Sequence, residues 1–196
     1  ELEAIDLVGN TKPSMETNLV LRAIAIVSVV SHHSALWAFG GAASFLMLLA
    51  GFNLARFSRK PLYDNKSKRD IFVSIYKLLI PYFLILITYQ IYKKDFDLES
   101  MLLLGNFVDR QRTFIEPFWF IQAFIQCNII FILIFSFKIT RAYAHAQEYI
   151  FAYLMLFFSL ALKFGMPYFL SLDGQPSYYL WNILFLFSFG WLMHVS

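Results

Sequence analysis

The sequence predicts an all-α protein, a multi-pass transmembrane bundle with about six membrane helices. Of its 196 residues, 59% are apolar, 19% are aromatic and only 15% are charged, whereas about a quarter of a soluble domain is charged. The mean hydropathy of +0.60 agrees with this contrast. Only helices and closed barrels satisfy their backbone hydrogen bonds in lipid, and the sequence lacks the short alternating segments of a barrel. Its long apolar runs therefore predict helices that cross a bilayer.

The first part of the chain divides into a leader and a helical hairpin. Residues 1–17 are polar and are expected to form a leader or linker, and residues 18–196 are expected to form the membrane domain. The first predicted span, Asn18 to Phe39, is long enough because about 20 helical residues cross a bilayer. A second apolar run, Ala42 to Phe57, starts directly after Gly40–Gly41. The two helices should therefore form a tight antiparallel hairpin.

The loop after the second span is the most basic in the chain. It contains Arg56, Arg59, Lys60, Lys66, Lys68 and Arg69. Short basic loops lie on the cytoplasmic side of membrane proteins. We therefore expect a multi-pass protein of the cell (inner) membrane, with its N-terminus in the cytoplasm. A substrate-binding patch is the alternative interpretation of the same charges.

Four further spans complete the prediction. The third runs from Ile71 to Tyr92, and a mixed-charge loop follows it on the outside. An apolar patch in that loop, Met101–Leu104, is too brief to span the bilayer and predicts a short interfacial or re-entrant helix. The remaining spans are expected from Glu116 to Phe137, from Tyr149 to Phe164 and from Tyr178 to Met193.

The first span carries the most informative polar residues of the chain. Arg22 and His33 are eleven residues apart, which at about 100° per residue puts them within roughly 20° of each other and ~16 Å apart along the helix axis. His32 falls roughly 80° off that face. Polar side chains are costly in lipid, so an aligned pair should point into the protein and mark a site. The alternative is that Arg22 reaches to the interface and His33 bonds a neighbouring carbonyl.

These residues also carry a resemblance to a known family. Arg22-Ala23-Ile24-Ala25, followed after an apolar run by His33, resembles the signature of the acyltransferase-3 family. Members are multi-pass membrane enzymes that move acyl groups, often acetyl, from acyl-CoA to sugars and other hydroxyl acceptors. The arginine and histidine at this spacing are the functional pair of that family.

The similarity continues along the chain in order. Gly40–Gly41 matches the family's Gly-rich turn, and Phe45–Phe52 matches a Phe-rich segment, although Ala50 replaces its serine and Ser44 stands where an aspartate is common. Lys77–Tyr82 and Pro117–Ile121 resemble motifs of the third and fourth family helices.

The resemblance also bears on the extent of the chain. Family members typically have about ten membrane helices, and this chain starts with Glu1 rather than Met and stops at Ser196 directly behind an apolar run. We therefore expect it to be the front part of a longer acyltransferase.

The resemblance implies a defined chemistry, which is acyl transfer other than aminoacyl transfer. His33 would act as general base on a hydroxyl of a carbohydrate or similar acceptor, since a buried imidazole is neutral and accepts a proton. Arg22 would hold an anion. Acyl-CoA would be the co-substrate, and no tightly bound cofactor is implied. Lys77 and Arg69 would bind the phosphates of the donor, and Trp119 would line a substrate channel; snorkelling and belt anchoring are the alternatives for these three residues.

Other function classes find little support in the sequence. The net charge of +3 gives no reason to expect nucleic-acid binding. Cys127 is the single cysteine, and no cluster of Cys, His and Asp has metal-ligand spacing. The rival hypothesis is a helical-bundle transporter or channel for a small anion, with Arg22 and His33 in the pathway. Transporters tend to show two repeated halves, and the sequence shows no internal repeat.

Overall fold

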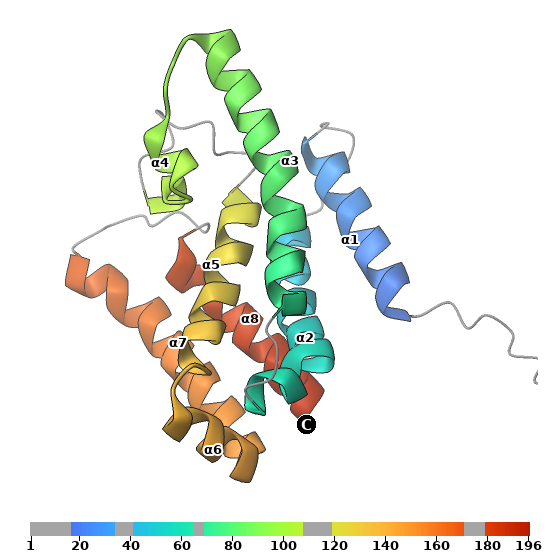
Figure 1. Cartoon of the computed structure of the whole chain (residues 1–196), viewed down its shortest axis with the longest axis vertical. Helices are drawn as coiled ribbons and strands as arrows, with labels where there is room; N and C mark the ends of the chain where they lie inside the picture. Colours follow the sequence, from blue (N-terminus) through green and yellow to red (C-terminus); the bar gives the residue numbers. More distant parts are fainter. Residues whose placement is uncertain (1–16, 34–40, 65–68, 108–118, 171–178) are drawn as a thin grey trace, which may run out of the picture.

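The computed structural model describes residues 17–33, 41–64, 69–107, 119–170 and 179–196. These residues form helices and connecting turns, with no strand among them, which confirms the all-α prediction (Figure 1). The elements are α1 (Thr17–His33), α2 (Ala42–Tyr63), α3 (Arg69–Lys93), α4 (Leu98–Met101), the 3-10 helix η1 (Gly105–Phe107), α5 (Trp119–Ile134), α6 (Lys138–Ala146), α7 (Glu148–Leu170) and α8 (Leu180–Val195).

Two of the described helices are long and apolar enough to cross a membrane. They are α3, over Ile71–Lys93, and α7, over Glu148–Tyr168. The pair α5 and α6 passes the same criterion together, but α6 is bent by 91° from α5. Two to three candidate spans indicate a membrane protein.

The six predicted spans are thus reproduced only in part. α1 and α8 are apolar but have 17 and 16 residues in the described part of the chain, short of the roughly 20 that a span needs. α2 has 22 residues, but its second half carries Arg56, Arg59 and Lys60. The expected starts at Glu116 and Tyr178, like the leader and the end of the first span, lie outside the described residues.

The core is aromatic and lies between α5 and α8. Phe131 of α5 sits with its ring centroid 5.1 Å from Phe187 and 5.2 Å from Trp191 of α8. Phe135 stacks on Trp191 at 5.5 Å. All four side chains are fully buried. α8 also packs along α2 and α7, so it is the central helix of the described bundle.

The helical hairpin expected near the start of the chain is partly described. α1 packs against α2, while residues 34–40 lie outside the described part. α2 begins at Ala42 as expected, directly after Gly41, whose φ of 87° lies in the left-handed region that glycine adopts without penalty.

The fourth predicted span ends earlier than expected, at Ile134 rather than Phe137. Arg141 of α6 reaches back to the break, and its Nη1 donates to the carbonyl oxygens of Phe135 at 3.1 Å and of Ser136 at 2.9 Å. The last carbonyls of a helix have no partner within it, so this guanidinium stabilises the end of α5 and the sharp turn into α6.

Candidate functional site

The predicted pair of Arg22 and His33 lies on one uninterrupted helix. α1 runs from Thr17 to His33 and so carries both positions; the side chains of Arg22, His32 and His33 lie outside the described residues. The described neighbours nevertheless define the faces of α1. Ala25 is buried, whereas Ile26 and Val27 are exposed.

The register of α1 places the two positions relative to these faces. At about 100° per residue, positions 22 and 33 fall roughly 60° and 80° around the axis from Ala25, and the exposed Ile26 falls about 100° from it on the same side. Both positions therefore lie on one stripe of the backbone, between the buried Ala25 and the exposed Ile26.

The three predicted substrate-binding residues come from different ends of helices. Lys77 is exposed about two turns into α3, and no described residue pairs with it. Arg69 is the first residue of α3, and its side chain lies outside the described residues. Trp119 opens α5 and is half-buried, with its ring edge-on to Phe120 at 6.1 Å. The described contacts do not join these residues into one site.

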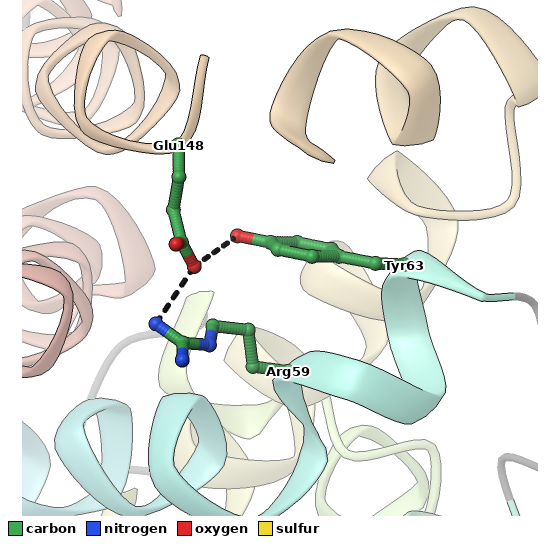
Figure 2. Close-up of polar contacts among 3 residues, drawn as sticks. All are labelled: Arg59, Tyr63 and Glu148. Atoms are coloured by element: carbon green, nitrogen blue, oxygen red, sulfur yellow. Dashed lines mark hydrogen bonds and ion pairs between the residues drawn. The ribbon is translucent and has the colours of Figure 1, made fainter. Parts of the chain in front are cut away.

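A polar cluster that the sequence did not predict ties α2 to α7. In this cluster, which we call the Glu148 cluster, Arg59 Nη1 lies 2.8 Å from Glu148 Oε1, and Tyr63 Oη donates to the same oxygen at 3.1 Å (Figure 2). Arg59 and Tyr63 are one turn apart on α2, so both side chains reach Glu148, the first residue of α7.

The surroundings of Tyr63 shape its chemistry. Its ring packs against Phe135 at 5.5 Å and lies edge-on to His145 at 6.0 Å. Burial, together with the charge of Glu148, raises the pKa of Tyr63 far above its ordinary value of 10.0. Tyr63 therefore stays protonated and acts as a donor to the carboxylate. Glu148 also stands at the positive end of the α7 dipole, where an acid is favourable.

A second polar cluster lies between α3, α5 and the segment that joins them. We call it the amide network; it consists of Tyr82, Asn106, Gln122 and Gln126. Gln122 Nε2 donates to Tyr82 Oη at 2.6 Å, and Gln122 Oε1 accepts from the Asn106 backbone N–H at 3.1 Å. Asn106 and Gln126 exchange two amide hydrogen bonds of 2.9 and 2.8 Å.

The amide network also holds backbone atoms. Tyr82 Oη donates to the carbonyl of Ser100 at 2.7 Å, and Gln126 Nε2 donates to the carbonyl of Leu103 at 2.5 Å. Asn106 and Gln122 are fully buried. Each of these side-chain amides has hydrogen-bond partners within the protein. The network therefore holds α3, α5 and the residues around Asn106 together.

One sequence signal could have revealed this network. Gln122 and Gln126 stand four residues apart in an otherwise apolar helix, and residues at this spacing share a face. Tyr82 belongs to the Lys77–Tyr82 motif, but that motif does not predict the buried hydrogen bond between the Tyr82 hydroxyl and Gln122. For the Glu148 cluster no comparable signal exists, because Tyr63 and Glu148 are 85 residues apart.

Neither cluster resembles a metal centre. Among the described residues, no three His, Cys, Asp or Glu side chains come together as metal ligands. Comparison of the chain with protein-family models, curated proteins and solved structures finds no match.

Proposed function

We propose that this chain is the front part of a membrane-embedded O-acyltransferase of the acyltransferase-3 type. It would move an acyl group, in the first place acetyl, from acyl-CoA to a hydroxyl of a carbohydrate or similar acceptor. The observation that carries the proposal is the position of Arg22 and His33 on α1. One continuous helix holds both positions, and its period of about 100° per residue supports their lying on one stripe.

The reaction assigns a separate task to each residue. His33 takes the proton from the acceptor hydroxyl, and the acceptor oxygen attacks the thioester carbonyl. The carbon–sulfur bond then breaks, and the coenzyme A thiolate leaves and is protonated. Arg22, which stays charged, positions an anionic group of the donor.

The orientation belongs to the same proposal. The basic end of α2 and the start of α3 would face the cytoplasm of a cell with an inner membrane, where acyl-CoA arrives, with the N-terminus on the same side. Lys77 and Arg69 at the start of α3 would meet the phosphates of the donor, and Trp119 would line the channel. The bilayer, acyl-CoA and the hydroxyl acceptor are then the partners.

Three substitutions test the proposal in membranes that contain the full reading frame. Release of free coenzyme A from acetyl-CoA, in the presence of candidate acceptors, is measured for each variant. His33→Ala should abolish the release while the protein stays in the membrane, and Arg22→Ala should weaken donor binding. His32→Ala, the neighbouring control, should retain most of the activity.

The same preparation separates the enzyme from its rival. Unchanged coenzyme A release in His33→Ala refutes the assignment of the base. Uptake of a small anion into sealed vesicles, lost in Arg22→Ala while no coenzyme A is released by the wild type, would instead indicate the transporter.

A further inference from the structure

We infer that residues 95–107 form a re-entrant hairpin that dips into the membrane and presents an apolar face to lipid acyl chains. The hairpin lies at the depth of the middle of α3. Tyr82 lies eleven residues from either end of the candidate span Ile71–Lys93, which is about 16 Å along the axis. Its hydroxyl donates to the carbonyl of Ser100 at 2.7 Å. The chain that leaves α3 at Lys93 therefore returns to the middle of α3 within seven residues.

Other contacts agree with this path. Gln90, two turns above Tyr82, donates through Nε2 to the carbonyl of Asp97 at 2.9 Å, so the chain descends between Asp97 and Ser100. Asn106 is then held by Gln122, the same residue that contacts Tyr82. Figure 1 shows α4 well below the upper end of α3.

The polar backbone groups of the hairpin have hydrogen-bond partners within the protein. Irregular backbone at membrane depth is tolerated only where protein or a water-filled cavity satisfies its polar groups. The hairpin meets this requirement with side chains. Asp97 Oδ1 accepts from the Ser100 N–H at 2.9 Å, Gln122 accepts from the Asn106 N–H, and Gln126 donates to the Leu103 carbonyl.

These contacts also explain two unusual features. Leu103 has a φ of 59°, a conformation that is rare for a bulky side chain and persists only where the surroundings hold it. Gln122 and Gln126 are polar residues on an apolar helix, and they supply the partners that the hairpin backbone needs.

The outer surface of the hairpin is apolar and exposed. Four apolar side chains of the hairpin are 47–69% exposed, namely Phe96, Leu98, Leu102 and Leu104. The backbone that carries them is held by hydrogen bonds to protein side chains. Leu98 and Leu102 lie one turn apart and share a face. The exposed apolar side chains of α3 include Leu84 and Ile91, which lie roughly 160–180° around the helix from Tyr82. Because the hairpin is held at the middle of α3, acyl chains at that depth of the bundle would contact its apolar face as well. The inference does not rest on the chemistry proposed for α1.

The two exposed carboxylates of the segment fit the same arrangement, while the third, Asp97, is buried and accepts from Ser100. Asp95 is exposed at the point where the chain leaves α3, at the level of the headgroups. Glu99 is exposed and lies about 100° around α4 from Leu98. A charge is costly in lipid, so we expect Glu99 to point away from the acyl chains that contact Leu98.

Spin labels test the inference in the full-length protein in liposomes. Single cysteines replace Leu84, Leu98, Leu102, Asp95 or Glu99 in a Cys127→Ala background, and collision rates with oxygen and with a water-soluble nickel chelate are compared. Labels at Leu98 and Leu102 should match a label at Leu84 of α3, with oxygen favoured. Labels at Asp95 and Glu99 should favour the chelate.

Two outcomes would overturn the inference. One is a label at Leu102 that favours the chelate as strongly as the label at Asp95, which would put the hairpin in water. The other is a label at Glu99 that matches Leu84, which would put a charged residue in lipid. The labelled side chains are exposed, so the labels leave the packing of the bundle intact, and the unlabelled Cys127→Ala protein is the control for the change in the core.

Discussion

Gly51 of α2 and Gly190 of α8 let the two helices cross with their backbones in contact. A Cβ atom on Gly51 would overlap the carbonyl oxygen of Phe187, and a Cβ atom on Gly190 would overlap the carbonyl oxygen of Leu48. Small residues at such crossings let two helix backbones approach closely and so allow tight van der Waals packing. The crossing fixes α8, whose Phe187 and Trp191 build the aromatic core.

Gly190→Ala should therefore destabilise the protein strongly. The added methyl group meets backbone, which cannot move aside as a side chain can, so we expect a loss of at least the ~1–3 kcal/mol that is typical of overpacking. The measurement is thermal unfolding in detergent. Ala161→Val, which adds two methyl groups on an exposed position of α7, is the control and should change stability by less than about 0.5 kcal/mol. Equal melting of Gly190→Ala and the wild type would contradict the close crossing.

Gln122→Leu should destabilise the protein through the amide network. The change leaves the Asn106 N–H buried without its acceptor, and an unsatisfied buried group costs about 1–3 kcal/mol. Gln147→Leu makes the same change at an exposed position and serves as the control. Chemical unfolding of both variants gives the comparison; a Gln122→Leu protein as stable as the control would show that the network contributes nothing.

The sequence anticipated the features that depend on local pattern. The third predicted span coincides with α3, and the fifth lies within α7, which continues past the predicted end at Phe164 to Leu170. Both were found because an apolar run of sufficient length determines a span. The start of α2 was also found, because Gly41 marks a turn. The predicted end of the fourth span was three residues too late, because the end of α5 depends on hydrogen bonds from Arg141 in the next helix.

Features that join distant residues were not predictable from one sequence. The contact between Gln122 and Tyr82 spans 40 residues and that between Tyr63 and Glu148 spans 85, and no local pattern encodes either. For the predicted site, the helical spacing of Arg22 and His33 followed from the sequence, whereas the burial of Ala25 and the exposure of Ile26 on the same helix required the structure.

Arg141→Ala should loosen the break between α5 and α6. The variant removes two charge-assisted hydrogen bonds to the Phe135 and Ser136 carbonyls. Because Arg141 is partly exposed, water replaces part of the loss, and we expect a cost of about 1 kcal/mol. Lys138→Ala removes an exposed charge of α6 and is the control. Hydrogen exchange of the amides of residues 135–141 should be faster in Arg141→Ala alone.

Glu148→Gln should have a modest effect at neutral pH. The carboxylate pairs with Arg59 and accepts from Tyr63, but about a quarter of each charged side chain is exposed, with values of 27% and 28%. Partly exposed ion pairs contribute about 0–1 kcal/mol, and the glutamine oxygen still accepts from Tyr63. Thermal unfolding should shift by no more than this range, and a loss of several kcal/mol would show that the Glu148 cluster is buried far more deeply.

The pH dependence of Tyr63 is the sharper test of the Glu148 cluster. Its pKa in the folded protein lies well above the ordinary 10.0 because of burial and the Glu148 charge. In the unfolded chain Tyr63 ionises near its ordinary pKa, so only the folded state holds the proton above pH 10. The stability that wild type has over Tyr63→Phe is thus fully present below pH 10 and is lost as the pH rises above it.

Absorbance of tyrosinate in the folded protein tests this sign directly. Just above pH 10, wild type and Tyr63→Phe should show the same tyrosinate absorbance, since Tyr63 contributes none. Glu148→Gln removes one of the causes of the raised pKa, so Tyr63 should ionise at a lower pH in that variant than in wild type. Burial still keeps the pKa of Tyr63 above its ordinary value. A clearly higher tyrosinate absorbance of wild type than of Tyr63→Phe at this pH would mean that Tyr63 is ionised. It would show that Tyr63 faces water and does not donate to Glu148.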